Sequence, residues 1–305
     1  MGTSKIIKKS LLMLLIATAV LFGVAIFENR APLADKKQTV QEKQTPLLRV
    51  YFLNVGQGDA IYIRTPNGQD ILIDGGPDNS VLSELGEVMP FWDREIDVMI
   101  LTHPHNDHVT GLVEVLRRFK VNQIYYTGAL HTAPHYLAWL EEIKKQKLKL
   151  NIVQDFFEVK FGDDLKLQFL YPQKNLVNQS FKELNDSSIV NRMVYKNVAY
   201  LFTGDASEKV EQELLKMGKD KKIELRSDVL KVGHHGSSSS SSESFLKAVN
   251  PKTAVIQSGV DNEFGHPHYK IIKRLERLGV KIIRNDENGM VEISTDGDQF
   301  DLLDD

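Results

Sequence analysis

The residues best suited to chemistry stand close together in the segment LTHPHNDHVTG, residues 101–111. This segment carries His103, His105, Asp107 and His108 within six positions. Neutral imidazole and carboxylate are the ligands that divalent transition metals prefer. Residues two apart in the turn can converge on one ion, and the two that follow can reach a second. We therefore predict that this turn forms half of a two-metal site.

Further polar clusters recur where predicted strands end, which is where sites are built in sandwiches and α/β sheets. They are Asp74 in ILIDGG, Asn185-Asp186-Ser187-Ser188, Asp205 in LFTGD, His234-His235-Gly236 and His266-Pro267-His268. Seven of the nine histidines fall in three short loops, namely the 101–111 segment, His234-His235-Gly236 and His266-Pro267-His268. His131 and His135 lie outside them and are expected to be surface or helix-start residues.

Asp205 follows an apolar strand and a glycine, so its carboxylate is well placed to bridge two cations. Two cations about 3.5–4 Å apart clamp both the attacking and the leaving oxygen of an in-line displacement, and they acidify the water between them. The serine run 237–242 is expected to be mostly a flexible loop, with Ser237 as its one candidate for phosphate contact.

The elements that must position these residues follow from hydrophobic periodicity and turn signals. Strands are predicted at 47–55, 60–65, 70–76, 97–103, 122–128, 165–172, 187–196, 198–205, 228–232, 253–259, 281–286 and 289–295. Helices are predicted at 108–119, 134–146, 207–217 (capped by Ser207), 242–249 and 268–279. Sheets in the middle with helices outside, twice over, predict an α/β fold of the four-layer αββα sandwich type.

Composition narrows the chemistry. The chain has 305 residues, a formal net charge of −3 and no cysteine, which excludes disulfides, thiolate ligands and a cysteine nucleophile. Any metal must therefore be held by nitrogen and oxygen. The low net charge gives no basic field of the kind that dominates general nucleic-acid binders.

We do not expect the N-terminal segment to be part of the folded domain. Three lysines precede the apolar run LLMLLIATAVLFGVAIF at 11–27, which fits a signal peptide or an uncleaved signal-anchor helix. Residues 28–46 are polar and read as a disordered tether. A single folded domain is placed at 47–305, and the positive-inside rule puts it outside the cytoplasm, anchored or secreted.

These motifs together carry a resemblance. THPHNDH resembles the His-x-His-x-Asp-His signature of the metallo-β-lactamase superfamily. NVGQGDA, ILIDGG, NDSSIV, LFTGD, LKVGHHGS and GHPH, in this order, are similar to the soluble domain of ComEC-type DNA-uptake proteins. The resemblance runs from about residue 48 to 296. It implies an αββα metallo-β-lactamase fold, a dinuclear site and hydrolysis, very often of phosphodiesters.

Carried over residue by residue, the resemblance implies that His103 and His105 bind one metal while Asp107 and His108 bind the other. Asp205 should bridge, and His234 should complete the second metal site, with His235 as the alternative.

The remaining residues receive supporting or catalytic roles. Asp74 is expected either to order the histidine turn through hydrogen bonds or to be a plain strand-end turn residue. The residues expected to support the ligands or contact substrate are Asp74, Asn185, Asp186, Ser237 and His268. The predicted catalytic residues are Asp107, His235 and His266, the two histidines to stabilise transition-state charge or protonate the leaving oxygen.

Three departures from the family pattern matter. Many superfamily members have a further histidine where this chain offers Asn185-Asp186; Asp186 as a substitute ligand would favour Mn²⁺ over Zn²⁺. Asn54 stands where the ComEC-type branch usually carries aspartate. The large membrane channel of the competence proteins is absent from the 305 residues, so the resemblance does not extend to DNA transport.

The expected function is an exported or membrane-anchored hydrolase with two divalent ions, Zn²⁺ or Mn²⁺, acting as a phosphodiesterase or nuclease through a metal-bridging hydroxide. The alternative keeps the site and changes the substrate to a cell-wall phosphodiester, phosphorylcholine or teichoic acid. An alternative of another class is a non-catalytic, metal-containing surface binding protein. The expected partners are the phosphodiester substrate (DNA or wall polymer) and the membrane, through the N-terminal helix.

Overall fold

Two β-sheets pack face to face in this structure, a computed structural model that describes residues 47–303. Within those residues the first sheet has eight strands in the order β15-β14-β1-β2-β3-β4-β5-β6. Their bounds are β1 Leu48–Phe52, β2 Ile61–Arg64, β3 Asp70–Ile73, β4 Glu95–Ile100, β5 Lys120–Tyr126, β6 Leu150–Ile152, β14 Val291–Thr295 and β15 Phe300–Leu303.

The second sheet has seven strands in the described part of the chain, in the order β13-β12-β11-β10-β9-β8-β7. Their bounds are β7 Phe157–Lys160, β8 Leu165–Tyr171, β9 Val190–Tyr195, β10 Val198–Phe202, β11 Val229–Lys231, β12 Thr253–Ile256 and β13 Lys281–Arg284. Each sheet is mixed, with an antiparallel meander beside a run of parallel strands.

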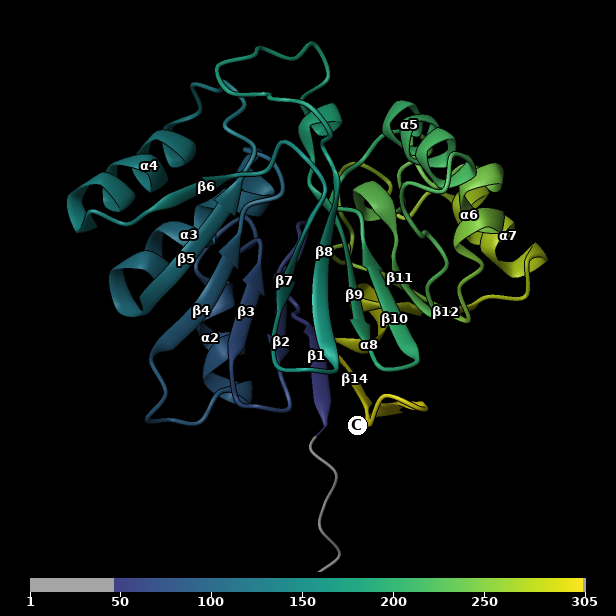
Figure 1. Cartoon of the computed structure of the whole chain (residues 1–305), viewed down its shortest axis with the longest axis horizontal. Coiled ribbons are helices and arrows are strands. Elements are labelled where there is room, and N and C mark those ends of the chain that lie inside the picture. Colours follow the sequence, from purple (N-terminus) through teal and green to yellow (C-terminus); the bar gives the residue numbers. More distant parts are fainter. Residues whose placement is uncertain (1–46, 304–305) are drawn as a thin grey trace, which may run out of the picture. The chain divides into compact units, whose positions relative to one another are not determined.

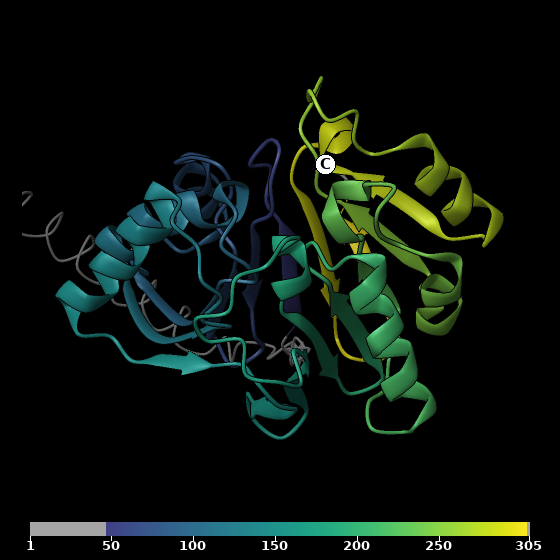
Figure 2. The ribbon, with the colours of Figure 1, turned by 90° about the horizontal axis from the view of Figure 1, so that it is seen from above.

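Helices cover the outer face of each sheet, as Figures 1 and 2 show. The first sheet carries α2 Ser80–Val88, α3 Asn106–Arg118 and α4 Pro134–Gln146; the second carries α5 Glu208–Lys219, α6 Glu243–Val249 and α7 Tyr269–Arg277. Short helical turns are η1 Leu184–Ser187, η2 Gly233–Gly236 and α8 Asn285–Asn288. The layers are thus helix, sheet, sheet, helix, as the sequence predicts.

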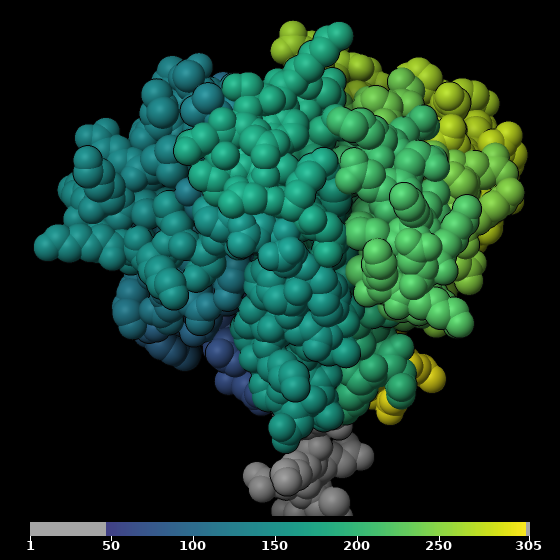
Figure 3. All heavy atoms as spheres, turned by 45° about the horizontal axis from the view of Figure 1, so that its top comes forward, coloured from purple at the N-terminus to yellow at the C-terminus, as the bar shows by residue number. Residues whose placement is uncertain are grey.

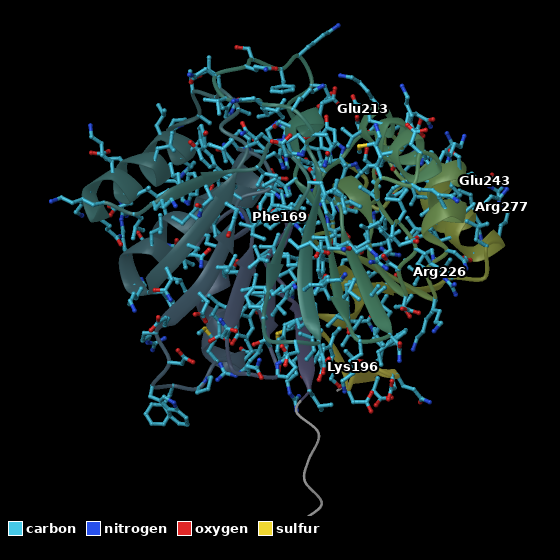
Figure 4. The ribbon with its side chains drawn as sticks, in the orientation of Figure 1. Phe169, Lys196, Glu213, Arg226, Glu243 and Arg277 are labelled. Atoms are coloured by element: carbon cyan, nitrogen blue, oxygen red, sulfur yellow. The ribbon has the colours of Figure 1, made fainter. Side chains whose placement is uncertain are left out.

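The core between the sheets is built from one face of each. Val50, Phe52 and Ile63 from the first sheet share a buried cluster with Phe169 and Phe202 from the second. Figure 4 labels Phe169 in the middle of the ribbon, between the two sheets. Because both faces of each sheet are covered, the parallel strands read as continuous apolar runs rather than as alternating patterns.

The predicted strands and helices all occur, with ends shifted by a few residues, but several short elements were not predicted. These are α2, β6, β7, α8 and β15. β6, β7 and β15 lie at or next to sheet edges, and neither β6 nor β7 has a buried residue, so they lack the apolar pattern that marks a central strand. α2 has neither a side-chain cap nor an acidic first turn, and it contains Gly86, which lowers its helix propensity.

Strand directions decide where the site lies. β3 and β4 run parallel in the first sheet, and β10, β11 and β12 run parallel in the second. The loops that follow the carboxyl ends of such strands gather at one edge of a sheet, the usual place for a site.

The predicted anchor (1–27) and tether (28–46) lie outside the described residues. From residue 47 to residue 303, no helix is both long enough and apolar enough to cross a membrane.

Candidate metal centre

Four histidine and aspartate side chains on the β4–α3 turn form what we call the first wall: His103, His105, Asp107 and His108. The turn leaves β4 as extended chain and enters α3 at Asn106, which brings ligand atoms two residues apart together. His103 Nε2 lies 3.0 Å from His105 Nδ1, and the rings of His103 and His108 are 4.2 Å apart. The first wall is therefore a single compact unit.

Asp74, at the end of β3, holds this wall in place. Its Oδ1 accepts a hydrogen bond from the Thr102 backbone N–H at 2.8 Å. Its Oδ2 accepts from the Thr102 hydroxyl at 2.6 Å and lies 2.8 Å from His108 Nδ1. The side chain is fully buried, so these contacts replace its hydration. Asp74 thus orders the histidine turn through hydrogen bonds.

Close backbone contact locks α3 against the β3 turn. The Gly75 N–H donates to the His108 carbonyl at 2.8 Å, and the Gly111 N–H donates to the Gly76 carbonyl at 3.2 Å. A Cβ at Gly111 would come within 2.0 Å of the Gly75 oxygen. Glycine is required there because the helix and the turn meet through their main chains.

Asp205 and His235 form the second wall, carried by loops that follow β10 and β11. The Asp205 Oδ2 atom lies 3.3 Å from His108 Nε2, 3.5 Å from His235 Nε2 and 3.7 Å from His103 Nε2. Two groups of ligand atoms result, each compact enough to hold a cation. They are Asp107, His108, Asp205 and His235, and His103, His105 and Asp205. Asp205 belongs to both groups, the position that a bridging ligand requires.

The histidine tautomers fit a metal centre. His108 Nδ1 faces Asp74, His235 Nδ1 lies 3.0 Å from the Gln257 carbonyl, and His103 Nδ1 lies 3.1 Å from the Thr102 hydroxyl. A proton on each Nδ1 leaves the Nε2 lone pair directed into the site. Within residues 47–303, the Nε2 atoms of His108 and His235 are buried without a hydrogen-bond partner. Buried orphaned nitrogens beside carboxylates fit a pair of divalent cations.

Asp59 and Lys231 support the second wall, and the sequence analysis did not single them out. The Lys231 ammonium is fully buried and forms an ion pair with the Asp59 carboxylate. Asp59 Oδ1 lies 3.2 Å from His235 Nδ1, so this carboxylate orients the ligand ring. Asp59 stands in the motif NVGQGDA and Lys231 in LKVGHHGS, but neither spacing shows that the two meet.

The pKa values reveal an excess of buried carboxylate. Burial alone would lower the pKa of His235, but the carboxylates of Asp205 and Asp59 raise it well above its usual value. His108 shows the same pattern, since Asp205 and Asp74 overcome the effect of burial and raise its pKa. Carboxylates that draw protons onto buried imidazoles also attract bound cations, which suits a metal centre.

His234, predicted as the ligand that completes the second metal site, is not placed in either group. Its Nε2 is 3.9 Å from Asp205 Oδ2, and Asn185 Nδ2 lies 3.3 Å from both ring nitrogens. Its neighbour His235 occupies the position instead, because both residues adopt positive φ, 49° and 53°, and this backbone turns the second ring inward. The sequence alternative, His235, fits the geometry.

The Asp186 carboxylate has partners outside the two ligand groups. Its carboxylate accepts a hydrogen bond from the Ser207 hydroxyl and pairs with Lys209 Nζ at 2.6 Å. Ser207 precedes α5 at the N-cap position, but its hydroxyl makes this contact and does not cap the helix, contrary to the prediction. Asn185, one residue earlier, is the member of this segment that faces the histidines.

The serine run is largely packed rather than a flexible loop. Ser240 and Ser241 are buried, and the Ser242 backbone N–H donates to the Glu211 carboxylate at 2.8 Å. Ser240 Oγ donates to the Gly233 carbonyl at 2.7 Å, which ties the run to the histidine loop. Ser237 is also buried, with its Oγ 3.1 Å from that of Ser239.

The two histidines of the His266-Pro267-His268 segment differ in their positions relative to the site. The His266 ring lies 5.5 Å from that of His234 and 6.3 Å from that of His235, so it borders the site. Burial, with His235 nearby, lowers the pKa of His266 to about 4, which leaves it neutral at pH 7 and disfavours a role as proton donor. The exposed His268 instead caps α7, accepting from the Lys270 N–H.

His131, expected to be an unrelated surface histidine, lies beside the first wall. Its ring centroid is 6.3 Å from that of His105. The segment that joins β8 to β9 lies at the same end of the fold as the site loops, as Figures 1 and 3 show in teal to green. It is tied to the loop after β5 by backbone hydrogen bonds, for example from the Asn178 N–H to the Gly128 carbonyl at 2.9 Å.

The fold and this donor set define the class. The chain belongs to the metallo-beta-lactamase superfamily, whose family model matches residues 53–260.

Similar curated proteins include one named as a competence protein and one named as a recombination protein. The chain is 31% identical over 263 residues to ComE operon protein 3 of Bacillus subtilis (strain 168), covering 80% of this chain and 32% of that protein. It is 31% identical over 252 residues to competence protein ComA of Neisseria gonorrhoeae, covering 78% and 31%. Recombination protein 2 of Haemophilus influenzae is 30% identical, covering 84% and 30%. The chain thus spans about a third of each relative's length.

Solved structures share the fold at low identity. Tm1679, described as a metal-dependent hydrolase of the beta-lactamase superfamily, matches with a TM-score of 0.50 at 13% identity, covering 78% of this chain and 95% of that one. CmlA, a diiron β-hydroxylase from Streptomyces venezuelae, matches with a TM-score of 0.51 at 13% identity, covering 78% and 52%. At this identity the likeness concerns the fold alone.

Proposed function

We propose that this superfamily hydrolase cleaves phosphodiester bonds, and that nucleic acid is its favoured substrate. The carrying observation is that two groups of ligand atoms share Asp205, which is the arrangement of a two-metal centre. Support for a nucleic-acid substrate comes from the names of the relatives, which include Recombination protein 2 and competence protein ComA. Uptake of DNA is not part of the proposal, since the chain spans only a third of those proteins.

The residues that would hold the ions are His103, His105 and Asp205 for one, and Asp107, His108, Asp205 and His235 for the other. Bound there, two Zn²⁺ or Mn²⁺ ions would acidify a water molecule and offset the charge of the phosphate.

The protein's own contribution is to fix the donors. Asp74 and the Gln257 carbonyl hold His108 and His235 with Nε2 facing inward. Neutral His266, at the border of the site, would donate an N–H hydrogen bond to a phosphate oxygen rather than transfer a proton.

A substrate panel with a matched pair of variants tests this proposal. The purified chain, supplied with Mn²⁺ or Zn²⁺, should cleave a single-stranded oligonucleotide, with a phosphorylcholine ester assayed in parallel. The double variant Asp107→Ala/His108→Ala should abolish cleavage. The double variant Asp163→Ala/His135→Ala, which removes the same residue types from exposed positions, should not.

Each outcome decides something. Cleavage that persists in Asp107→Ala/His108→Ala contradicts the proposed site. Cleavage of the phosphorylcholine ester alone moves the substrate to the cell wall. About two bound ions per chain with no cleavage of any phosphodiester would favour a metal-containing binding protein instead.

We further propose that the chain is held at the outer side of a membrane through its apolar N-terminal segment, residues 11–27. The supporting observation is the lysine-flanked apolar run followed by a polar segment. Protease added to intact cells should remove the domain, and the chain should resist extraction from membranes by alkaline carbonate. A domain that is protected in intact cells would contradict the orientation.

A further inference from the structure

The turn between α2 and β4 presents two aromatic rings to solvent. Phe91 is 82% exposed and Trp92 73%, which makes them the two most exposed large apolar side chains among residues 47–303. Their rings meet edge to face, with centroids 4.7 Å apart at 86°. Single exposed apolar residues are common, but two adjacent exposed rings that pack on each other form a small apolar patch suited to an apolar partner.

This turn is firmly attached to the fold. The Asp93 N–H donates to the Pro90 carbonyl at 2.8 Å, which closes the turn around the two rings. Asp93 Oδ2 accepts from Arg64 Nη1 at 3.3 Å, and the Lys120 N–H donates to the Arg94 carbonyl at 2.8 Å. The rings are therefore displayed by a pinned turn, and little ordering is needed when they bind a partner.

The charges that flank the rings are largely paired. Asp93 forms its ion pair with Arg64, and Glu95 pairs with Lys120 at 2.9 Å. The Arg94 guanidinium lies over the ring of Phe119, 5.4 Å from its centroid. Paired carboxylates repel a lipid surface less than free ones do, so the rings can approach the headgroup region of a bilayer.

Strand directions place the turn at the end of the fold opposite the metal centre. β1 and β3 both pair antiparallel with β2, and β3 is parallel to β4, so β1 and β4 begin at the same end. Figure 1 shows the α2–β4 connection and the start of β1 at its lower edge, and Figure 4 labels Lys196 at this end. The metal-binding turn follows the carboxyl end of β4.

The chain upstream of Leu48 indicates which partner this end of the domain would meet. That stretch carries the apolar run at 11–27 and then a mostly polar segment of 19 residues, 28–46, before the first strand. A chain spans at most ~3.3–3.6 Å per residue, so this length allows the domain to reach a membrane that holds the apolar run.

We propose that Phe91 and Trp92 insert into the headgroup region of a lipid bilayer and seat the domain with its metal centre facing away from the membrane. The aromatic side chains of tryptophan and phenylalanine favour this region. Two rings alone bind weakly, so they act together with the N-terminal segment. The inference rests on the proposed membrane location and is independent of which bond the enzyme hydrolyses.

The tryptophan content makes this directly measurable. The full chain has two tryptophans, Trp92 and Trp139, and Trp139 is fully buried between α4 and its sheet. The full chain is reconstituted with phosphatidylcholine vesicles whose acyl chains carry bromine at shallow or deep positions. Trp139→Phe isolates the emission of Trp92, and Trp92→Phe isolates that of Trp139.

The expected result is that Trp92 emission shifts to shorter wavelength in vesicles. Shallow bromines should quench it more strongly than deep ones, whereas Trp139 emission should be unchanged. The substitution Phe91→Ser should reduce the quenching of Trp92 emission. If Trp139→Phe does not fold, the unsubstituted chain gives the same comparison, with Trp139 as a constant background. Trp92 emission that keeps its aqueous wavelength in vesicles overturns the proposal. A shift that appears with protein concentration in the absence of lipid overturns it in favour of a second copy of the chain.

Discussion

The first wall places four donor side chains on one turn of six residues, whereas the second wall takes Asp205 and His235 from loops after two different strands. Asp74 and backbone contacts hold the first wall. These contacts come from the turn after β3, the strand next to β4 in the same sheet. The second wall depends on the buried pair Asp59 and Lys231. Lys231 lies on β11 of the second sheet, whereas Asp59 lies in the connection between β1 and β2 of the first. The comparison suggests that local geometry sets one wall and long-range charge pairing sets the other.

Asp205 is the point where the two walls meet, so its substitution should have the largest effect. Asp205→Asn keeps the volume but removes the charge that both ligand groups share. We expect both ions to be lost and kcat/KM to fall on the order of 10⁴-fold, because no remaining group offers a bridging carboxylate. Metal content and oligonucleotide cleavage measured on one sample would check this.

His105→Ala is the matching test for a residue that belongs to only one ligand group. It should remove a single ion. Asp301→Asn, an exposed carboxylate, is the control and should keep both. If Asp205→Asn retained two ions per chain, the bridging assignment would be wrong.

Lys231→Met should mainly lower the free energy of unfolding and leave the contacts of the first wall in place. The Asp59 carboxylate would stay buried without its partner, and its pKa, held down by Lys231 and His235 against the effect of burial, would rise. Breaking a buried ion pair on one side costs about 3–5 kcal/mol. Urea unfolding of the metal-free protein should show that loss in the free energy of unfolding.

The matched double variant separates the pair from its surroundings. Asp59→Asn/Lys231→Met removes both charges and should recover much of the loss. Single effects that simply add would show that the two charges do not support each other, and the second wall would then need another explanation.

Asp74→Asn should loosen the first wall without unfolding the protein. The amide oxygen can still accept from the Thr102 N–H, but the amide nitrogen cannot accept from His108 Nδ1. Loss of such an orienting partner typically lowers metal affinity about 10–100-fold. Competition with a chelator would measure it, and an unchanged affinity would return Asp74 to the status of an ordinary turn residue.

The same contrast explains how far the sequence could reach. The first wall was predictable because its donors are neighbours along the chain, and the αββα layers were predictable because strands covered on both faces leave long apolar runs. The choice of His235 over His234 was not, because it depends on two consecutive positive φ values that tertiary contacts impose. Asp59 and Lys231 were missed for a similar reason, since 172 positions of chain separate them and only the folded sheets bring them together.

Asp186 offers the smallest and most discriminating test, because the sequence left it open as a substitute metal ligand and the structure gives its carboxylate other partners. Both of its oxygens are engaged, one by the Ser207 hydroxyl and one by Lys209, whose side chain is 68% exposed. An ion pair with one exposed partner contributes about 1 kcal/mol or less. Asp186→Asn should therefore keep both ions and change the free energy of unfolding by no more than that. Loss of one ion would instead make this carboxylate a ligand and extend the first ligand group into the η1 turn, so metal content decides between the two arrangements even if activity is unchanged.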